Sequence, residues 1–380
     1  MQLQQIILDS NLEETILFSK DEFNAQKSNL VLAFGERIFL ENTNPYKKLN
    51  SLYPNAQIII CSTAGQISNT TLVKQNSVAT AIQFEKSTIK TTEIDIIYNS
   101  DIDLLGNKIK EDLLTDDLKS ILIISEGSFI NGTELINELI KKTEGLIPIF
   151  GGLAGDEYNF EKTIVGLNAD ASVGKIVAVG FYGDHLHFGF GSEGGWSDFG
   201  PERDVTDSDK NVLYKIGDRS ALEIYKEYLG KYADELPGSS LYFPLSMKEN
   251  PDSEPIVRTI LSIDEEKKSM TFAGNIPIGS TVRFMKGNID KLIDASYAAA
   301  EEIYKKQVHQ PELAFLVSCV GRRIVLGNRI EEEIEVVKEV FGDKMLVCGF
   351  YSYGEISPTL NKVACELHNQ TMTLTTIFES

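Results

Sequence analysis

The chain has 380 residues, 42% of them hydrophobic and 24% charged, a composition typical of a soluble globular protein with a sizeable core. Its formal net charge of −20 repels phosphate backbones and anionic membrane surfaces, and its longest basic clusters contain only two residues. No apolar run approaches the roughly 20 residues that span a bilayer, and the first residues lack a basic region followed by an apolar stretch. We therefore expect a cytoplasmic protein with no nucleic-acid or membrane partner.

Three segments, taken in chain order, share one pattern. Each has an apolar run, a glycine-bearing turn, a segment of helical periodicity, and a second apolar run whose closing turn ends on Gly plus an acid or amide. The segments are 30–66, 121–156 and 313–355. The two turn glycines of each segment, at 35 and 65, 127 and 155, and 321 and 354, are 30, 28 and 33 residues apart. Such regular spacing indicates an internal repeat.

Each segment reads as a βαβ unit, because two apolar runs separated by a helical stretch imply a parallel crossover. In the third segment Ile330, Ile334, Val337 and Phe341 form one helical stripe. A strand-like stretch follows each unit, and its alternation favours antiparallel pairing. These stretches are 78–84, 176–181, and 363–367 continuing into 372–378. The predicted fold is α/β with two domains, in which mixed sheets are built from repeated βαβ-like units with added antiparallel strands.

The predicted domain boundary lies in a turn-rich stretch between the second and third segments. Residues 194–218 contain Pro201 and many acids, and two further helical segments follow, around 221–229 and 293–304. We therefore divide the chain into domains 1–215 and 216–380.

Several short motifs resemble the paired FIST-N and FIST-C domains of bacterial signal-transduction proteins. They are CSTAG (61–65), GGLAGD (151–156), FPL (243–245), GFYSYGE (349–355) and LHNQT (367–371). The resemblance covers the chain from about residue 28 to the end, with a FIST-N-like sensory domain first and a FIST-C-like domain second. It implies an intracellular sensory module that binds small ligands, amino acids being the proposed class. Nothing remains for an output domain, so we expect a separate signalling partner such as a kinase or cyclase.

A candidate ligand site follows from the repeat. Ligands of open α/β sheets bind beyond the carboxyl ends of strands, where both turns of every unit lie. In the third unit this edge gathers Arg322, Arg323, Tyr351, Tyr353 and Glu355. An arginine fork binds a carboxylate, Glu355 can accept an ammonium group, and the tyrosines can exclude water. The alternative is an Arg–Glu ion pair that braces two loops, with the tyrosines in the core.

Two further polar residues join the candidate set. Asp156, Gln66 and Glu355 close equivalent turns, where an acceptor that holds backbone amides explains their equivalence more simply than catalysis does. A carboxylate at such a turn can still serve a ligand, so Asp156 stays a ligand-binding candidate. Asn369, in the LHNQT motif, is the other.

His368 has two readings. It lies in the final strand-forming stretch, where a core histidine is the simpler interpretation. The family resemblance adds another, because some FIST proteins resemble nitric-oxide sensors that bind haem through a histidine, and His368 is the best-placed match. Apart from this haem alternative we expect no cofactor. No metal site is expected either, since Cys365 would face away from His368, and His185 and His187 lack a third ligand.

Familiar catalytic signatures are absent from the sequence. It has no P-loop, no G-x-S-x-G elbow and no zinc-type cysteine pair, and the G-x-G-x-x-G at 189–194 does not open a helix. We therefore do not expect an enzyme, although two alternatives stay open: Cys319 or Cys61 as a nucleophile beside a distant histidine, and an unrecognised enzyme with its site at the Gly-acid turns. Three function classes remain: a small-ligand sensor, a haem-based nitric-oxide sensor and an unrecognised enzyme.

Overall fold

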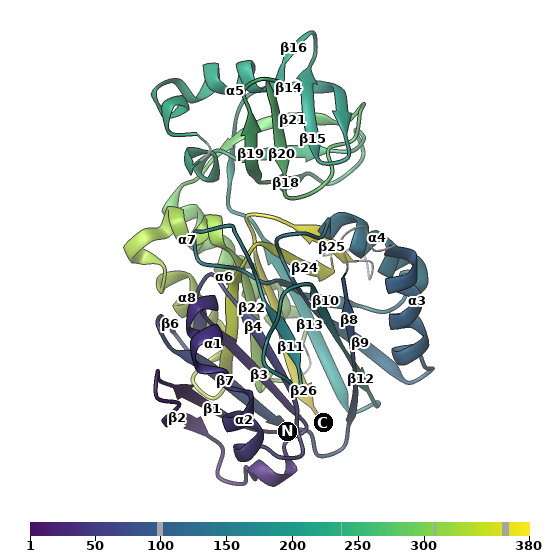
Figure 1. Cartoon of the computed structure of the whole chain (residues 1–380), viewed down its shortest axis with the longest axis vertical. Coiled ribbons are helices and arrows are strands. Elements are labelled where there is room, and N and C mark those ends of the chain that lie inside the picture. Colours follow the sequence, from purple (N-terminus) through teal and green to yellow (C-terminus); the bar gives the residue numbers. More distant parts are fainter. Residues whose placement is uncertain (97–101, 237, 308, 359–364) are drawn as a thin grey trace.

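The structure, a computed structural model, describes residues 1–96, 102–236, 238–307, 309–358 and 365–380. The three predicted βαβ units are confirmed, each with its two strands parallel (Figure 1). The strand pairs are β3 (Leu30–Gly35) with β4 (Gln57–Ser62), β9 (Leu118–Ser125) with β10 (Ile149–Leu153), and β22 (Leu313–Cys319) with β23 (Leu346–Ser352). The intervening helices are α1 (Arg37–Thr43), α2 (Tyr46–Leu52), α4 (Gly132–Lys142), α7 (Val320–Leu326) and α8 (Glu332–Phe341).

The added antiparallel strands are also present, so the mixed α/β class is confirmed. A return strand pairs with the first strand of each unit, and an outer strand pairs with the return strand. The return strands are β7 (Ser77–Gln83), β12 (Lys175–Tyr182) and β26 (Met372–Glu379), and the outer strands are β1 (Gln2–Leu8), β8 (Thr88–Asp95) and β13 (Leu186–Glu193). Residues 363 and 364 of the predicted strand 363–367 lie outside the described residues, and β25 (Cys365–His368) covers the rest.

The units exchange strands in a cycle. The strand that follows each second parallel strand pairs with the corresponding strand of a different unit: β5 (Gln66–Ser68) with β23, β11 (Val165–Leu167) with β4, and β24 (Gly354–Pro358) with β10. The three resulting sheets have the orders β11-β4-β3-β7-β1-β2, β25-β24-β10-β9-β12-β8 and β13-β26-β22-β23-β5-β6, with β2 at Glu14–Ser19 and β6 at Thr71–Val73. Each sheet is therefore completed by a neighbouring unit.

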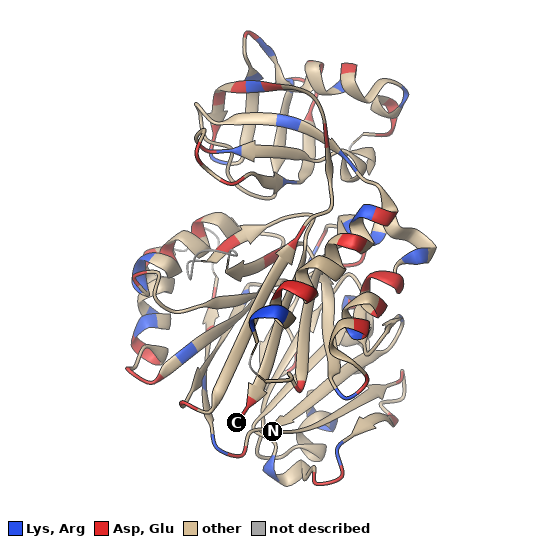
Figure 2. Cartoon of the chain, turned by 180° about the vertical axis from the view of Figure 1, so that it is seen from behind, with Lys and Arg blue, Asp and Glu red and all other residues tan. Residues whose placement is uncertain are grey.

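The three sheets enclose a common apolar centre. Phe34, Phe150, Phe315 and Phe350 meet there, with ring centroids 4.8 Å apart for Phe34–Phe350 and 6.1 Å apart for Phe150–Phe315. Helices cover the other face of each sheet, including α3 (Ile102–Leu113) and α6 (Ile289–Lys306). Charged residues gather on the outward faces of these helices and in the loops, while the strands carry few (Figure 2).

A fourth sheet lies beyond α7, at the top of Figure 1. Its strands are β14 (Ser197–Asp209), β15 (Val212–Ile216), β16 (Arg219–Ser220), β17 (Leu245–Lys248), β18 (Ile256–Arg258), β19 (Ile260–Asp264), β20 (Ser269–Phe272) and β21 (Thr281–Lys286). Together with α5 (Ala221–Leu229) they form a separate core. We call residues 197–286 the β insert, because they interrupt the third unit between β13 and α6. The predicted division between 215 and 216 falls inside this insert and stays a prediction.

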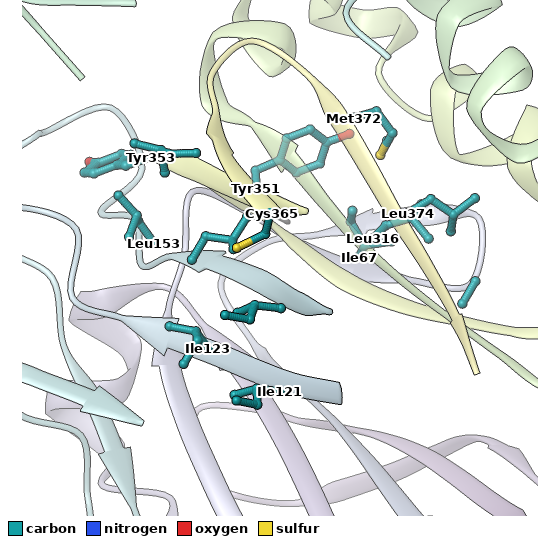
Figure 3. Packing of buried hydrophobic residues seen from close by; sticks show 14 of the residues in the cluster. Ile67, Ile121, Ile123, Leu153, Leu316, Tyr351, Tyr353, Cys365, Met372 and Leu374 are labelled. Atoms are coloured by element: carbon teal, nitrogen blue, oxygen red, sulfur yellow. The ribbon is translucent and has the colours of Figure 1, made fainter. Parts of the chain in front are cut away.

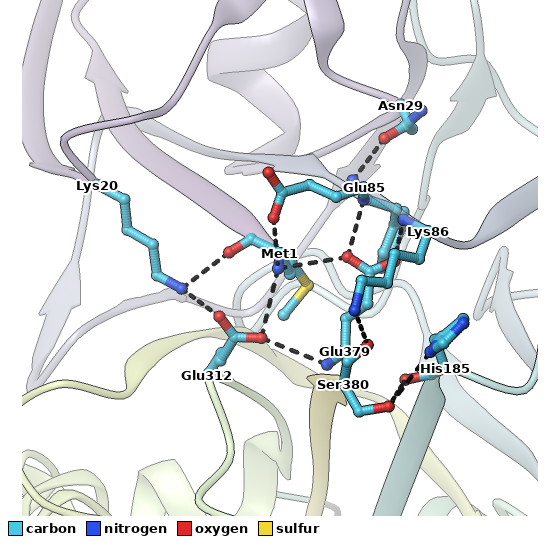
Figure 4. Close-up of polar contacts among 10 residues, drawn as sticks. Met1, Lys20, Asn29, Glu85, Lys86, His185, Glu312, Glu379 and Ser380 are labelled. Carbon is cyan, nitrogen blue, oxygen red and sulfur yellow. Dashed lines mark hydrogen bonds and ion pairs between the residues drawn. The ribbon is translucent and has the colours of Figure 1, made fainter.

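Carboxylates join the first and third units at the end of the core opposite the β insert (Figure 4). The amine of Met1 lies 3.4, 3.6 and 3.3 Å from Glu85, Glu312 and Glu379. Glu379 also accepts hydrogen bonds from the backbone N–H groups of Glu85 and Lys86, at 2.8 and 2.9 Å. These contacts hold the ends of β7, β22 and β26 together, away from the Gly-acid turns.

We predict that Gly349→Ala severely destabilises the protein. Gly349 has φ +153°, and a Cβ there would lie 1.9 Å from the carbonyl oxygen of Leu316 in the neighbouring parallel strand. The two strands would have to separate, so we expect a loss of about 3 to 5 kcal/mol in the free energy of unfolding, measured by urea denaturation. Gly238→Ala is the matched control, since no atom of the described residues outside its chain neighbours lies within 4 Å of the added carbon. Equal stability of the two variants would contradict the close approach.

Candidate functional site

The three Gly-acid turns meet, as the repeat predicted. Gly155 N–H donates to the carbonyl of Ser62 (3.0 Å), Ala64 N–H to that of Tyr351 (2.8 Å), and Tyr353 N–H to that of Leu153 (3.2 Å). Each turn thus bonds to the other two. The carboxyl ends of β4, β10 and β23 consequently share one location next to α7.

Arg322 is a fully buried structural arginine. Its guanidinium forms an ion pair with Glu333 of α8, with Nη2 and Nε 2.7 and 3.0 Å from Oε2. It also donates to the carbonyls of Gly194 (2.6 Å) and Leu292 (2.8 Å) and to Ser296 Oγ (2.9 Å). The buried ion-pair alternative therefore describes Arg322, but its partner is Glu333 and not Glu355.

Tyr351 belongs to the same buried network. Its hydroxyl donates to Glu333 Oε1 at 2.7 Å, and Ser318 Oγ donates to the same oxygen at 3.1 Å. Burial raises the pKa of Tyr351 well above its usual value, so the phenol stays protonated. Figure 3 shows Tyr351 packed among apolar side chains that include Cys365 and Leu316. Tyr351 is therefore a core residue that helps to fix Glu333.

Glu355 is fully buried and accepts hydrogen bonds from its own turn and from Thr371, which precedes β26. It receives hydrogen bonds from Ser352 Oγ (2.7 Å) and from the N–H (3.2 Å) and Oγ (3.0 Å) of Thr371. Burial nevertheless raises the pKa of the carboxyl to about 8, because the apolar surroundings penalise its charged form more than the donors favour it. This arrangement matches the amide-holding role expected for residues that close these turns.

Asp156 and Tyr353 position the loop that follows the second turn. Asp156 Oδ1 accepts from Nε of Arg37 at 2.9 Å, and Oδ2 accepts from the N–H of Lys162 at 3.3 Å. The Tyr353 hydroxyl accepts from the N–H of Phe160 at 3.1 Å, and the two rings stack with centroids 4.6 Å apart. Both residues thus set the course of the backbone between 156 and 162.

Asn369 and His368 lie inside the core. Nδ2 of Asn369 donates to the carbonyl of His368 at 2.9 Å, while its Oδ1 has no hydrogen-bond partner within the described residues. Nε2 of His368 lies 3.3 Å from the carbonyl oxygen of Ser357. Burial lowers the pKa of the imidazole to about 4, so the ring is neutral at physiological pH.

Arg323 is the predicted ligand residue that borders open space. It lines a cavity of about 470 Å³, which we call the Arg323 cavity, together with Leu72, Lys74, Tyr158, Ile324, Gly327, Asn328 and Ile330. Its Nη1 donates to the carbonyl of Ala64 and to Glu157 Oε2 (2.7 Å). The guanidinium also lies over the Tyr158 ring, with Cζ 4.7 Å from the centroid. Within the described residues, Nε and Nη2 form no hydrogen bond.

A second cavity adjoins the first through shared Tyr158 and Ile324. This Tyr242 cavity, of about 450 Å³, is lined by Tyr158, Phe160, Glu235, Gly238, Ser239, Leu241, Tyr242, Ile260, Leu261 and Ile324. Its wall includes η3 (Gly238–Tyr242) of the β insert, which contacts α7. The Tyr242 cavity therefore lies where the β insert meets the core, and the Arg323 cavity adjoins it on the core side.

Tyr158 and Phe160 are site residues that sequence reasoning missed. They follow the GGLAGD motif directly, and their side chains are 48% and 41% exposed although both are large and aromatic. Glu157 and Phe160 also adopt positive φ, at 51° and 55°. Two aromatic residues in a polar loop just after a Gly-acid turn were the available signal.

We predict that Glu333→Gln costs about 3 to 5 kcal/mol in the free energy of unfolding, because it leaves the Arg322 charge buried without a counter-ion. Glu332→Gln on the same helix is the matched control. Glu332 pairs with Arg329 at 2.7 Å, but both side chains are more than 40% exposed, so we expect a loss below about 1 kcal/mol. Chemical denaturation of both variants gives the comparison, and equal losses would refute the role of the buried pair.

We predict that Glu355→Gln removes a pH dependence of stability. The carboxyl has a pKa of about 8 in the folded protein against an ordinary 4.5, so the folded state favours the protonated form. Its contribution is full below pH 4.5 and is lost as pH rises toward about 8. The unfolding free energy of the wild type should therefore fall relative to that of the variant across this window. A difference independent of pH, measured by denaturation at successive pH values, would contradict the raised pKa.

Comparison with known proteins assigns the family. The model of the FIST N domain matches residues 29–219, and that of the FIST C domain matches residues 221–358. No curated protein matched the chain. A solved structure described as "Cyanuric acid hydrolase: evolutionary innovation by structural concatenation" is similar at 8% identity and a TM-score of 0.38, covering 100% of this chain and 99% of that one. FIST domains are associated with sensory roles in signal transduction. The chain belongs to the FIST family, with a FIST N domain followed by a FIST C domain.

Proposed function

We propose that this protein is a cytoplasmic bacterial sensor that binds a small carboxylate-bearing ligand, with amino acids as the leading class, in the Arg323 cavity. It would act through a separate signalling protein such as a kinase or cyclase. Membership of the FIST family supports the sensory role. Among the described residues, no helix is long and apolar enough to cross a bilayer.

The observation that carries the proposal is the environment of Arg323. The side chain is 5% exposed, yet it lines a cavity of about 470 Å³, and within the described residues its Nε and Nη2 form no hydrogen bond. Lys74 lines the same cavity and adds a second positive charge. A guanidinium with two unoccupied nitrogens can bind a carboxylate through paired hydrogen bonds. Glu157 already partners Nη1, which orients the guanidinium without occupying Nε or Nη2.

The rest of the site suits an apolar or aromatic ligand side chain. Tyr158 separates the two cavities, and Tyr242 and Leu261 in the Tyr242 cavity are 42% and 44% exposed. Large exposed apolar groups gathered around a buried charge are typical of small-ligand sites. A ligand that reached from Arg323 to Tyr242 would touch both α7 of the core and η3 of the β insert. A bound ligand would thus favour the arrangement of core and β insert in which both contacts are made.

The haem alternative has less support. It requires an open slot next to His368, but His368 is only 9% exposed and its Nε2 faces the carbonyl of Ser357. The Arg323 and Tyr242 cavities are lined by other residues. The neutral imidazole could ligate iron, so a Soret band in protein from haem-supplemented cells that disappears in His368→Ala would revive this function.

The enzyme alternative is also weaker. Burial raises the pKa of the Cys61 and Cys319 thiols, so neither supplies a thiolate at neutral pH. Asp156 accepts hydrogen bonds from Arg37 and Lys162, and Glu355 accepts them from Ser352 and Thr371, so both carboxyl groups are already engaged within the protein. Residues with the chemistry of catalysis are therefore engaged in structural roles at the meeting point of the turns.

Calorimetric titration of the full chain with the twenty amino acids tests the proposal. We expect at least one to bind, and Arg323→Gln to weaken that binding by about 1.5 to 3 kcal/mol, the range for a hydrogen bond to a charged group. Lys74→Gln should weaken it less, because Lys74 is exposed. Arg329→Gln is the matched control, since Arg329 pairs with Glu332 and Asp290 on the surface. Absence of binding, or unchanged affinity in a folded Arg323→Gln variant, would reject the site.

A further inference from the structure

A third cavity, of about 250 Å³, lies between α4 of the second unit, β25 of the third unit and the β insert. Its volume lies below the range of about 300 to 1,000 Å³ typical of sites for drug-sized ligands, so it suits a smaller ligand. It shares no lining residue with the Arg323 or Tyr242 cavities. Any ligand bound here would occupy a separate site.

Arg258, at the end of β18, supplies a buried cation to this cavity. The residue is 4% exposed, and its Nε and Nη1 donate to the carbonyls of Asn275 (3.2 Å), Leu367 (3.1 Å) and Val257 (3.3 Å). Within the described part of the chain, no carboxylate forms an ion pair with it and Nη2 has no hydrogen-bond partner. The contrast with Arg322 is direct, because Arg322 is equally buried but has Glu333. A buried charge without a counter-ion is strongly unfavourable, so the position of Arg258 needs an explanation.

The surroundings hold the guanidinium in place. A Cβ on Gly274 would lie 2.9 Å from Nε and 3.0 Å from Cζ of Arg258, and 2.8 Å from Oγ1 of Thr133. Glycine at 274 therefore leaves the room that the guanidinium occupies against α4. Burial lowers the pKa of Arg258 to about 10, while the nearby carboxylates of Glu366 and Glu249 favour its charged form.

Two acids line the same cavity without contacting Arg258. Glu366 is half-buried and Glu249 is exposed, so negative charge lies toward the opening and positive charge lies inside. Ile136 and Met247 supply apolar wall between them. We propose that this cavity binds a small free α-amino acid, with its carboxylate on Nη2 of Arg258 and its ammonium group toward Glu366 and Glu249. The ligand carboxylate supplies the direct ion pair that Arg258 lacks among the described residues, and the acids select a zwitterion over a simple anion.

Binding at this site would connect the β insert to the core. Arg258 belongs to the insert, Leu367 to β25, and Ile136 to α4, and β25 contacts both α4 and β18. An amino acid on Arg258 therefore adds contacts across a boundary that otherwise depends on hydrogen bonds such as that between Arg258 and the Leu367 carbonyl.

Titration calorimetry of the full chain with L-alanine, acetate and ethylamine tests the proposal, because the last two carry only one of the two charged groups. We expect L-alanine to bind and each half-ligand to bind at least about tenfold more weakly. Arg258→Gln should weaken L-alanine binding by about 10- to 100-fold, as expected for loss of a charge-assisted hydrogen bond. Gly274→Ala, which displaces the guanidinium but keeps its charge, should also weaken it. Arg323→Gln should leave it unchanged, so failure of this site and failure of the Arg323 site are distinguishable.

Arg283→Gln is the matched control, since Arg283 is a half-exposed arginine of the β insert that pairs with Asp198. Thermal unfolding gives an independent readout. Removal of an uncompensated buried charge predicts that ligand-free Arg258→Gln keeps or raises the melting temperature, while losing the stabilisation that L-alanine gives to the wild type. Acetate binding as tightly as L-alanine, absence of L-alanine binding, or a lower melting temperature in Arg258→Gln with unchanged affinity would each overturn the proposal.

Discussion

The cyclic exchange of strands is the constraint on which the rest of the structure depends. Each second parallel strand would leave an unpaired edge if its own unit had to complete the sheet. β5, β11 and β24 supply the missing partners from neighbouring units. This exchange brings the three Gly-acid turns into direct hydrogen-bonding contact. The meeting point is consequently dense and buried, and the open space lies around it, next to the β insert.

Buried charges separate the structural residues from the candidates for ligand binding. Arg322 has Glu333, two carbonyls and a hydroxyl as partners, so its desolvation is compensated within the protein. Glu355 avoids the desolvation penalty of a buried charge in another way. Its raised pKa keeps the carboxyl group protonated, and therefore neutral, over much of the physiological pH range. Arg323 and Arg258 are less completely matched, and each borders a cavity. An incompletely matched cation beside open space is where a ligand carboxylate gains most.

Much of the fold could be predicted from the sequence, because local periodicity specifies the βαβ units and the return strands. The exchange of strands between units could not be predicted from the sequence, because it depends on pairing between residues as distant along the chain as Gln66 and Phe350. Residues at neighbouring positions on one helix can also differ in role in a way that the sequence does not show. Arg322 and Arg323 look equivalent in sequence, yet successive residues on α7 point in different directions, one toward Glu333 and the other toward the cavity. Tyr158 and Phe160 were missed because polar loops carry no periodic signal.

The location of the cavities determines which parts of the molecule a bound ligand would contact. The Tyr242 and Arg258 cavities are each lined by residues of both the core and the β insert, with no residue in common, and the Arg323 cavity adjoins the Tyr242 cavity. The insert joins the third unit through only two connections, from β13 to β14 and from β21 to α6. A ligand can shift such an arrangement only by the difference in its affinity for the two states. Charged groups contributed from both sides of one boundary, as at Arg258 and Glu366, provide such a difference, because the ligand contacts form completely only when insert and core are together.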